Sequence, residues 1–308
     1  MTLKQIEEGI DSRWRVSDHQ LATADATSAP LHLITILYRS SKSFRGFLDG
    51  LRAQDRRDWR LHVIDNGDPE SVAILEAHVD PRISFIRNPG NVGFARAANQ
   101  GLREALAEGA KAVVLINNDI IMPSDLLRTL GEAGRKLPGA VMSPRIMGAD
   151  KPNDAHYAGG SIRRNWIYQN IHHAYDPQIT EPQRVEFAPG CCLLVPAGVL
   201  NKVGLLDERF FVYWEDSDFC RRLNQAGIPI YYLPKISILH QGGESSGGLF
   251  GPTYNRLFYC SYMQFLRKHF GFTEAVTTLL RLARQDWERG KYSDLKLKTG
   301  AMLRGLLR

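Results

Sequence analysis

Cysteine is scarce in this chain, with four among 308 residues. Four cysteines are too few for the disulfide framework of a protein this size. Cys191 and Cys192 are adjacent, and neither Cys220 nor Cys260 belongs to a Cys-x-x-Cys pair. We therefore expect four reduced, buried thiols in a cytoplasmic protein.

Long apolar runs are missing as well. No stretch approaches the roughly 18 residues of a membrane-spanning helix, and residues 1–15 contain acids and no apolar segment of the kind found in secretory signals. The chain also lacks Gly-x-Gly-x-x-Gly and Gly-Lys-Ser/Thr, so we expect neither a dinucleotide fingerprint nor a P-loop. Its 44% hydrophobic and 23% charged residues exclude collagen-like, coiled-coil and wholly disordered chains.

Positive charge is concentrated at the C-terminal end. Residues 256–308 carry eleven Lys or Arg and four Asp or Glu, a net +7, so the first 255 residues are close to neutral. A basic helical extension over 251–308 that mixes Leu and Met with Arg and Lys suits an anionic membrane surface. We expect segment 272–308 to meet that surface through Leu303, Leu306 and Leu307, with Arg304 and Arg308 at the headgroups.

Two other interpretations of this basic segment stay open. It is a solvated helix face, or it packs on the rest of the chain or on a second subunit, as in a homodimer. We expect no nucleic-acid partner.

Strands and helices alternate in the first half of the chain. Apolar, β-branched runs predict strands, and segments with one apolar face predict helices. The expected strands are 31–38, 59–64, 83–87 and 111–116, and the expected helices are 43–54, 71–78 and 94–108. This order predicts an α/β fold with a mixed, mainly parallel sheet flanked by helices.

The remaining segments are less regular. We expect a linker over 1–29, a main domain over 30–250 and the helical extension over 251–308. Within the main domain, the pattern predicts short strands at 140–146 and 228–233, an irregular or hairpin segment at 153–180, an apolar segment at 187–195, helices at 197–203 and 215–226, and a Gly/Ser loop at 241–251.

Three of the predicted strands end in polar, turn-forming residues. These ends are Asp65-Asn66-Gly67, Asn88 to Gly93 and Asn117-Asn118-Asp119. Parallel strands bring their carboxyl ends to one edge of the sheet, where ligands bind. We therefore expect one crevice lined by all three.

Several residues there and further along the chain can carry chemistry. Asp119 at a strand end suits a divalent cation, although a turn or cap role fits it too. Gly93 and Arg96 at a helix start suit an anion, and tight helix–sheet packing is the alternative. His240, before the Gly/Ser loop, is a candidate metal ligand, whereas the other eight histidines lack such a setting.

An acidic cluster opens the helix expected at 215–226. Glu215, Asp216 and Asp218 follow Trp214 and other aromatics, a combination that suits a sugar, since rings stack on its apolar face and a carboxylate accepts a hydroxyl proton. The acids also suit the helix dipole. The spacing of Asp218 to Arg222 predicts a helical ion pair.

Taken in order, these motifs resemble the inverting family-2 glycosyltransferases of the GT-A fold, above all bacterial rhamnosyltransferases that build O-antigen and other surface polysaccharides. The resemblance covers about residues 31–250. It implies a nucleotide-sugar pocket, an acceptor side, a Mg²⁺ or Mn²⁺ site and a catalytic base. The residues implied are, for the pocket, Asp65, Asn91, Gly93, Phe94, Arg96, Asn99, Asn117 and Asn118; for the acceptor, Trp214 and Glu215; for the metal, Asp119 and His240; and for the base, Asp216.

The sequence departs from the family pattern at two places. Asn117 stands where the metal motif Asp-x-Asp has its first acid, and the first strand ends Leu37-Tyr38-Arg39-Ser40 where relatives often have Tyr-Asn-Ser. The first change reduces the charge available for a metal. The second leaves the base-pocket contacts of that loop open.

The resemblance implies transfer of a sugar, first of all L-rhamnose from dTDP-rhamnose, from a dTDP- or UDP-linked donor to a glycan or polyprenyl-diphosphate-linked acceptor. The enzyme would lie on the inner face of the bacterial cytoplasmic membrane as a peripheral protein. The alternatives are a sugar-1-phosphate nucleotidyltransferase, whose Gly-rich signature residues 37–42 do not supply, and a non-catalytic membrane-associated protein with a transferase-like domain.

Overall fold

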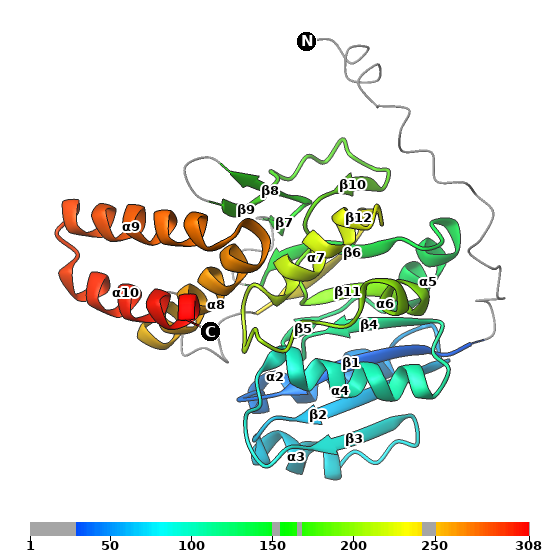
Figure 1. The fold of residues 1–308 in the computed structure, drawn as a ribbon. Helices are drawn as coiled ribbons and strands as arrows, with labels where there is room; N and C mark the ends of the chain where they lie inside the picture. The colour runs from blue at the N-terminus through cyan, green and yellow to red at the C-terminus, as the bar shows by residue number, and fades with distance from the viewer. Residues whose placement is uncertain (1–28, 150–154, 165–167, 242–250, 308) are drawn as a thin grey trace, which may run out of the picture.

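The computed structural model describes residues 29–149, 155–164, 168–241 and 251–307. Figure 1 shows a large twisted sheet with helices on both faces and, beside it, a group of three C-terminal helices. The expected linker up to residue 28 and the Gly/Ser loop at 242–250 lie outside the described residues.

The first half of the sheet is the expected parallel one. Strands β1 (Leu31–Leu37), β2 (Trp59–Asp65), β3 (Ile83–Arg87) and β4 (Ala112–Ile116) pair in the order β4-β1-β2-β3, all parallel. Their connections contain α2 (Ser41–Arg52), α3 (Pro69–Glu76) and α4 (Phe94–Ala107). Strands β1, β2 and β4 are almost wholly buried, as expected for apolar runs covered on both faces.

The second half of the sheet mixes directions. Strand β11 (Cys192–Pro196) runs antiparallel between β4 and β6 (Val141–Gly148), and β12 (Ile230–His240) pairs parallel to β6. The apolar segment at 187–195 therefore becomes a central strand. Smaller elements complete this half: β5 (Ile120–Ile121), β7 (Ala155–Tyr157), the hairpin β8 (Gly160–Arg164) with β9 (Tyr168–His172), β10 (Gln183–Val185), α5 (Leu126–Lys136), α6 (Ala197–Val203) and α7 (Glu215–Gln225).

Strand β12 is longer than the strand predicted at 228–233. It continues to His240 through a register shift between Leu233 and Ser237. Pro234 lies inside this shift, and a proline cannot donate the ladder hydrogen bond of a regular strand. The bulge thus extends the strand as far as His240.

Helix α4 lies very close to the sheet. A Cβ atom on Gly101 would meet side-chain atoms of Ile34 and Ile64 at 2.8 Å. The alanines of α4 that face the sheet are fully buried. The small residues on this face of α4 therefore allow close helix–sheet packing.

Helices α8 (Pro252–Phe270), α9 (Phe272–Glu288) and α10 (Tyr292–Leu307) enclose a second apolar cluster. Phe210 and Trp214 enter it from the main domain, and Trp214 stacks on Tyr262 with ring centroids 4.5 Å apart. Leu306 is 6% exposed inside this cluster, so the expectation that it faces lipid is wrong. None of the helices in the described ranges has both the length and the apolarity needed to span a bilayer.

A buried carboxylate joins the main domain to the C-terminal helices. Asp218 is fully buried, and its oxygens lie 2.9 Å from Arg222 Nε, 2.5 Å from Lys268 Nζ and 2.7 Å from His269 Nε2. The predicted Asp218–Arg222 ion pair is present, but α8 supplies the other two partners. Burial alone would raise the pKa of Asp218, but hydrogen bonds from His269 and Lys268 lower it below its usual value.

Asp218→Asn should therefore destabilise the protein by about 3–5 kcal/mol, because Arg222 and His269 lose their charged partner and Lys268 keeps only Asp207. Urea unfolding followed by circular dichroism measures the change. Glu288→Gln is the matched control: Glu288 pairs with Arg284 on the surface, with side chains 57% and 81% exposed, and should change stability by less than about 1 kcal/mol. Equal effects of the two substitutions would show that the charge of Asp218 does not hold the main domain and the C-terminal helices together.

Candidate active site

A cleft of about 1750 Å³ lies at the carboxyl edge of the sheet. Its floor comes from the ends of β1, β4 and β12, and its far wall from the start of α7 and from helices α8 and α10. The three polar strand ends meet there as predicted, since Asn66, Asn91 and Asn117 to Asp119 all line the cleft. This is the position where open α/β sheets bind ligands.

Asp119 and His240 face each other in this cleft. Pairing of β5 with β12 sets His240 opposite Ile120, and the Gln241 N–H donates to the Asp119 carbonyl at 3.0 Å. As a result, Asp119 Oδ1 lies 3.2 Å from His240 Nε2. This buried oxygen accepts no hydrogen bond from any described residue. A carboxylate and an imidazole in this arrangement fit a divalent cation.

Asparagine side chains hold the neighbouring loops. Asn66 Nδ2 donates to Asn91 Oδ1 at 2.9 Å, and Asn66 Oδ1 accepts from the Val92 N–H at 2.9 Å. Asn118 is buried and donates to the Ile36 carbonyl at 2.6 Å, which joins the ends of β4 and β1. These bonds give the cleft a preformed floor.

The start of α4 differs from the expected anion site. Phe94 lines the cleft, but its N–H donates to the Phe211 carbonyl at 2.6 Å. Gly93 has φ of 93°, and a Cβ atom there would lie 2.6 Å from the same carbonyl oxygen. Gly93 thus allows close approach of the chain around Phe211.

Five of the predicted site residues, Gly93 among them, do not line the cleft. Asp65 accepts from the N–H groups of residues 67 and 68 at 2.8 Å each. Arg96 pairs with Glu208 at 3.2 Å. The Asn99 amide donates to the Leu206 carbonyl and accepts from its N–H. Trp214 is buried among the C-terminal helices, and the aromatic residues that line the cleft are instead Phe94, Tyr38, Tyr157, Phe211, Tyr213 and Tyr254.

Glu215 and Asp216 begin α7 after two residues in the left-handed region, Tyr213 and Trp214, each with φ of 67°. Non-glycine residues rarely adopt this conformation, and strain of this kind clusters at functional sites. Asp216 Oδ1 accepts from the Ser217 N–H at 2.7 Å, and its Oδ2 accepts from the Gly190 N–H at 3.3 Å. Both acids line the cleft.

Burial changes the charge of this acidic pair. It is the main cause that raises the pKa of both carboxyl groups, and the negative charge of Asp216 raises that of Glu215 further, to about 8. Hydrogen bonds from Ser217 and Gly190 offset part of the rise for Asp216. Glu215 therefore keeps its proton to a higher pH than an ordinary glutamate does.

Three further cleft residues are not marked by any motif in the sequence. His172 lines the cleft, and its positive charge would lower the pKa of Asp216. Its Nδ1 hydrogen-bonds the His156 carbonyl. Arg256 and Arg304 line the far wall from α8 and α10. Only the long-range docking of these segments brings them to the site, which a local motif cannot reveal.

The four cysteines form no disulfide, as expected. Cys192 and Cys220 are buried, but Cys191 and Cys260 are only partly buried and line the cleft.

The sheet order, the cleft at its carboxyl edge and the carboxylates within it define a glycosyltransferase of the GT-A type. The model of the family "Glycosyl transferase family 2" matches residues 33–204, more than half of the chain, and the chain belongs to this family. The resemblance seen in the motifs is thereby confirmed.

Two curated relatives illustrate the range of the family. A low-salt glycan biosynthesis hexosyltransferase, Agl10 of Haloferax volcanii, is 25% identical over 213 residues, which cover 68% of this chain and 66% of the relative. An N-acetylglucosaminyl-diphospho-decaprenol L-rhamnosyltransferase of Mycobacterium tuberculosis is 24% identical over 241 residues, 70% of this chain and 78% of the relative.

Solved structures share the fold. TarS 1-349 of S. aureus, in complex with UDP, superposes with a TM-score of 0.54 at 12% identity. The match covers 83% of this chain and 72% of the TarS chain. GalNAc-T7 with UDP, GalNAc and Mn²⁺ gives a TM-score of 0.55 at 13% identity. This match covers 77% of this chain and 50% of the GalNAc-T7 chain. Both support the GT-A assignment.

The pKa of Glu215 in the folded protein is raised above the ordinary 4.5 of a glutamate, to about 8. Glu215 therefore contributes stability that is fully present below pH 4.5 and is lost as the pH rises through about 8. Glu215→Gln should flatten this decline, so that the variant gains stability relative to the wild type between pH 5 and 8. Thermal unfolding of both proteins across pH 5–9 measures it. Parallel curves would contradict a protonated Glu215.

Proposed function

We propose that the protein is a metal-dependent inverting glycosyltransferase that moves one sugar from a nucleoside-diphosphate donor to a hydroxyl of a glycan or lipid-linked glycan. One observation carries this proposal above the others: the Asp119–His240 pair and the Asp216 carboxyl group line the same cleft. Transfer from a nucleoside diphosphate needs a cation for the leaving diphosphate and a base for the acceptor, and the cleft offers residues for both.

Asp216 is the base in this mechanism. Its carboxylate accepts the proton of the acceptor hydroxyl as the oxygen attacks the anomeric carbon from the side opposite the leaving group. Hydrogen bonds from Gly190 and Ser217 hold its two oxygens in place. A single displacement requires only one base.

Asp119 and His240 would hold Mg²⁺ or Mn²⁺. The buried Asp119 oxygen without a hydrogen bond and the facing imidazole nitrogen fit such an ion. When bound, the ion supplies positive charge to the diphosphate. Asn117 lies beside it, with its amide nitrogen 3.5 Å from His240 Nε2, where a second acid would have added charge.

For the donor we propose L-rhamnose linked to dTDP, with a UDP-linked sugar as the second choice. The Mycobacterium tuberculosis relative is an L-rhamnosyltransferase whose name includes a decaprenol-linked diphosphate. A polyprenyl diphosphate is also our proposal for the acceptor, since Arg256 and Arg304 face the cleft and guanidinium groups bind phosphates in a bidentate manner. The pathway is synthesis of O-antigen or another surface polysaccharide.

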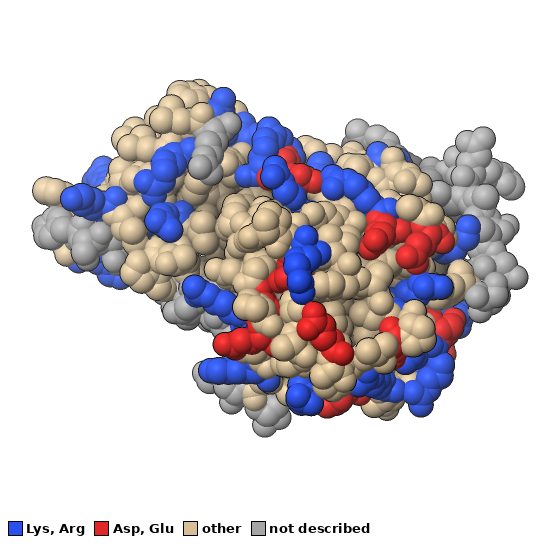
Figure 2. Space-filling model, turned by 90° about the horizontal axis from the view of Figure 1, so that it is seen from below, with Lys and Arg blue, Asp and Glu red and all other residues tan. Residues whose placement is uncertain are grey.

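A membrane surface fits the C-terminal helices. Helices α9 and α10 expose large apolar side chains, among them Leu280 at 62%, Trp287 at 61% and Leu307 at 80%. Figure 2 shows a face on which the Lys and Arg side chains over these helices, at the left, have no acidic ones among them. We propose that this surface docks on the anionic inner face of the cytoplasmic membrane.

The family match favours a transferase over a nucleotidyltransferase, and the acidic pair with the Asp119–His240 pair favours an active enzyme over a non-catalytic one. That two copies of this chain form a homodimer also stays a prediction.

Two substitutions test the proposal. Asp216→Asn should lower the turnover of sugar transfer by at least about 100-fold, because it removes the base, and should leave thermal stabilisation by dTDP or UDP with Mn²⁺ intact. Asp119→Asn should instead lose the part of the thermal stabilisation by nucleotide that depends on Mn²⁺. Transfer assays and thermal unfolding with each nucleotide measure both.

Glu132→Gln, on the surface of α5, is the matched control and should change neither property. Full activity of the Asp216 variant would remove this residue from the role of base. A wild-type protein that no nucleotide stabilises, with or without Mn²⁺, would contradict the donor site.

The double substitution Leu280→Glu with Leu307→Glu should weaken binding to vesicles that contain anionic lipid by about tenfold or more, since each leucine adds apolar area at the membrane. Val79→Glu is the control: Val79 is 91% exposed and follows α3, far along the chain from these helices. Co-sedimentation measures the bound fraction. If both proteins bind like the wild type, α9 and α10 do not form the docking surface.

A further inference from the structure

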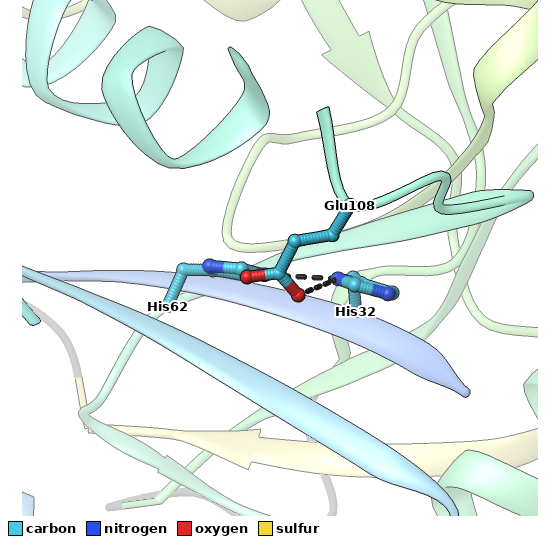
Figure 3. A group of neighbouring side chains, drawn as sticks. All are labelled: His32, His62 and Glu108. Carbon is cyan, nitrogen blue, oxygen red and sulfur yellow. Dashed lines mark hydrogen bonds and ion pairs between the residues drawn. The ribbon is translucent and has the colours of Figure 1, made fainter. Parts of the chain in front are cut away.

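Two buried histidines and a glutamate meet away from the cleft. His32 lies at the start of β1 and His62 in the middle of β2, and Glu108 directly follows α4. Since the cleft lies where these strands end, this group occupies the other end of the sheet. Figure 3 shows His32 joined by dashed lines to His62 and to the Glu108 carboxylate, which lies beside the two rings. Nothing in the mechanism proposed above uses these residues.

The donor atoms of the three side chains lie close together. His32 Nδ1 is 2.9 Å from His62 Nε2 and 3.8 Å from Glu108 Oε2, and one ligand atom from each residue falls within 4.8 Å of the others. Among the residues that the structure describes, no second group of three or more His, Cys, Asp or Glu meets this condition.

The contacts of His62 fix which of its nitrogens is free to bind. Its Nδ1 lies 2.8 Å from Ser84 Oγ, which itself donates to Glu104 Oε2 at 3.4 Å. Nδ1 is therefore the protonated donor, and Nε2 carries the lone pair that points towards His32. An imidazole oriented by an outer carboxylate in this way is typical of metal-binding histidines.

Burial keeps His32 neutral. The residue is 2% exposed, and desolvation, followed by the charge effect of His62, lowers its pKa below the ordinary value. A neutral imidazole is the form that binds a metal. The two rings share only one hydrogen bond with each other, whereas both can offer a lone pair to a cation.

The group is open to solvent on one side. A cavity of about 450 Å³ is lined by His32, Arg60 and Glu108, so an ion and a water ligand can reach it. Arg60 Nε, 3.6 Å from Glu108 Oε2, is the nearby cation that an arriving metal would displace from this carboxylate.

We propose that His32, His62 and Glu108 form a second metal site, separate from the cleft, that binds Zn²⁺ in preference to Mg²⁺. Two imidazole nitrogens and one carboxylate oxygen form a donor set that favours Zn²⁺ and other transition metals, whereas Mg²⁺ prefers oxygen ligands. The ion joins β1 and β2 to the end of α4, so it stabilises the folded chain rather than taking part in sugar transfer.

The test uses the full chain, freed of metal by dialysis against a chelator, and Co²⁺ as a spectroscopic substitute for Zn²⁺. Asp119→Asn removes the cleft ligand and serves as the background. In that protein, Co²⁺ should give visible d–d absorption that saturates at one equivalent and is abolished by Zn²⁺ but not by Mg²⁺. Zn²⁺ should also raise the unfolding temperature by mass action.

In the Asp119→Asn protein, a further Glu108→Gln or His32→Gln substitution should weaken Co²⁺ binding by more than about 100-fold. This loss is larger than the loss expected for a residue that only hydrogen-bonds a metal ligand. The Glu108 side chain is 35% exposed, so its substitution keeps the test valid even if the buried His32 variant fails to fold. Glu132→Gln is the matched control and should leave the absorption unchanged.

Three results would overturn this second site. They are no Co²⁺ absorption in the folded Asp119→Asn protein, absorption that survives Glu108→Gln, and displacement by Mg²⁺ as readily as by Zn²⁺. Because the readout is spectroscopic and needs no sugar donor, failure here leaves the proposed transferase function untouched.

Discussion

The buried carboxylate of Asp218 is the contact on which the active-site geometry depends. A single negative charge, fully removed from water, is shared by Arg222 of its own helix and by Lys268 and His269 of α8. Such a charge is costly to bury unless it is paired. This charge joins the main domain to the C-terminal helices beside the apolar cluster that also connects them, within one turn of the acidic pair of the cleft.

Several features of the cleft follow from this junction. With α8 docked on α7, Trp214 stacks on Tyr262 and the chain before α7 passes through two left-handed residues. Glu215 and Asp216 at the start of α7 and Arg256 of α8 then line the same wall of the cleft. This side of the site is thus assembled from parts of the chain that the buried ion pairs and the apolar cluster hold together.

The sequence predicts the first half of the fold well and the second half less completely. Strands β1 to β4 have local signals, an apolar run followed by a turn, and their parallel order follows from the intervening helices. The apolar segment that becomes β11 contains no information about its partners, so its antiparallel insertion between β4 and β6 could not be foreseen. Asp119, His240 and Asp216 each stand beside a local signal in the sequence, and all three line the cleft. No local signal marks His172 or Arg304, because their place in the cleft depends on packing between distant segments. The motif around Asn99 predicts a pocket residue, but its amide binds the backbone at Leu206.

The close contact at Gly93 has a consequence for how this site can change over evolutionary time. The atoms that a Cβ would strike include the backbone oxygen and Cα of Phe211, not only its ring. Replacing Phe211 therefore cannot make room for a larger residue at position 93. The side chain at position 211 can change while the backbone contact stays, whereas position 93 must stay glycine as long as the two loops remain joined. Mutational tolerance is therefore unequal at the two positions of this contact.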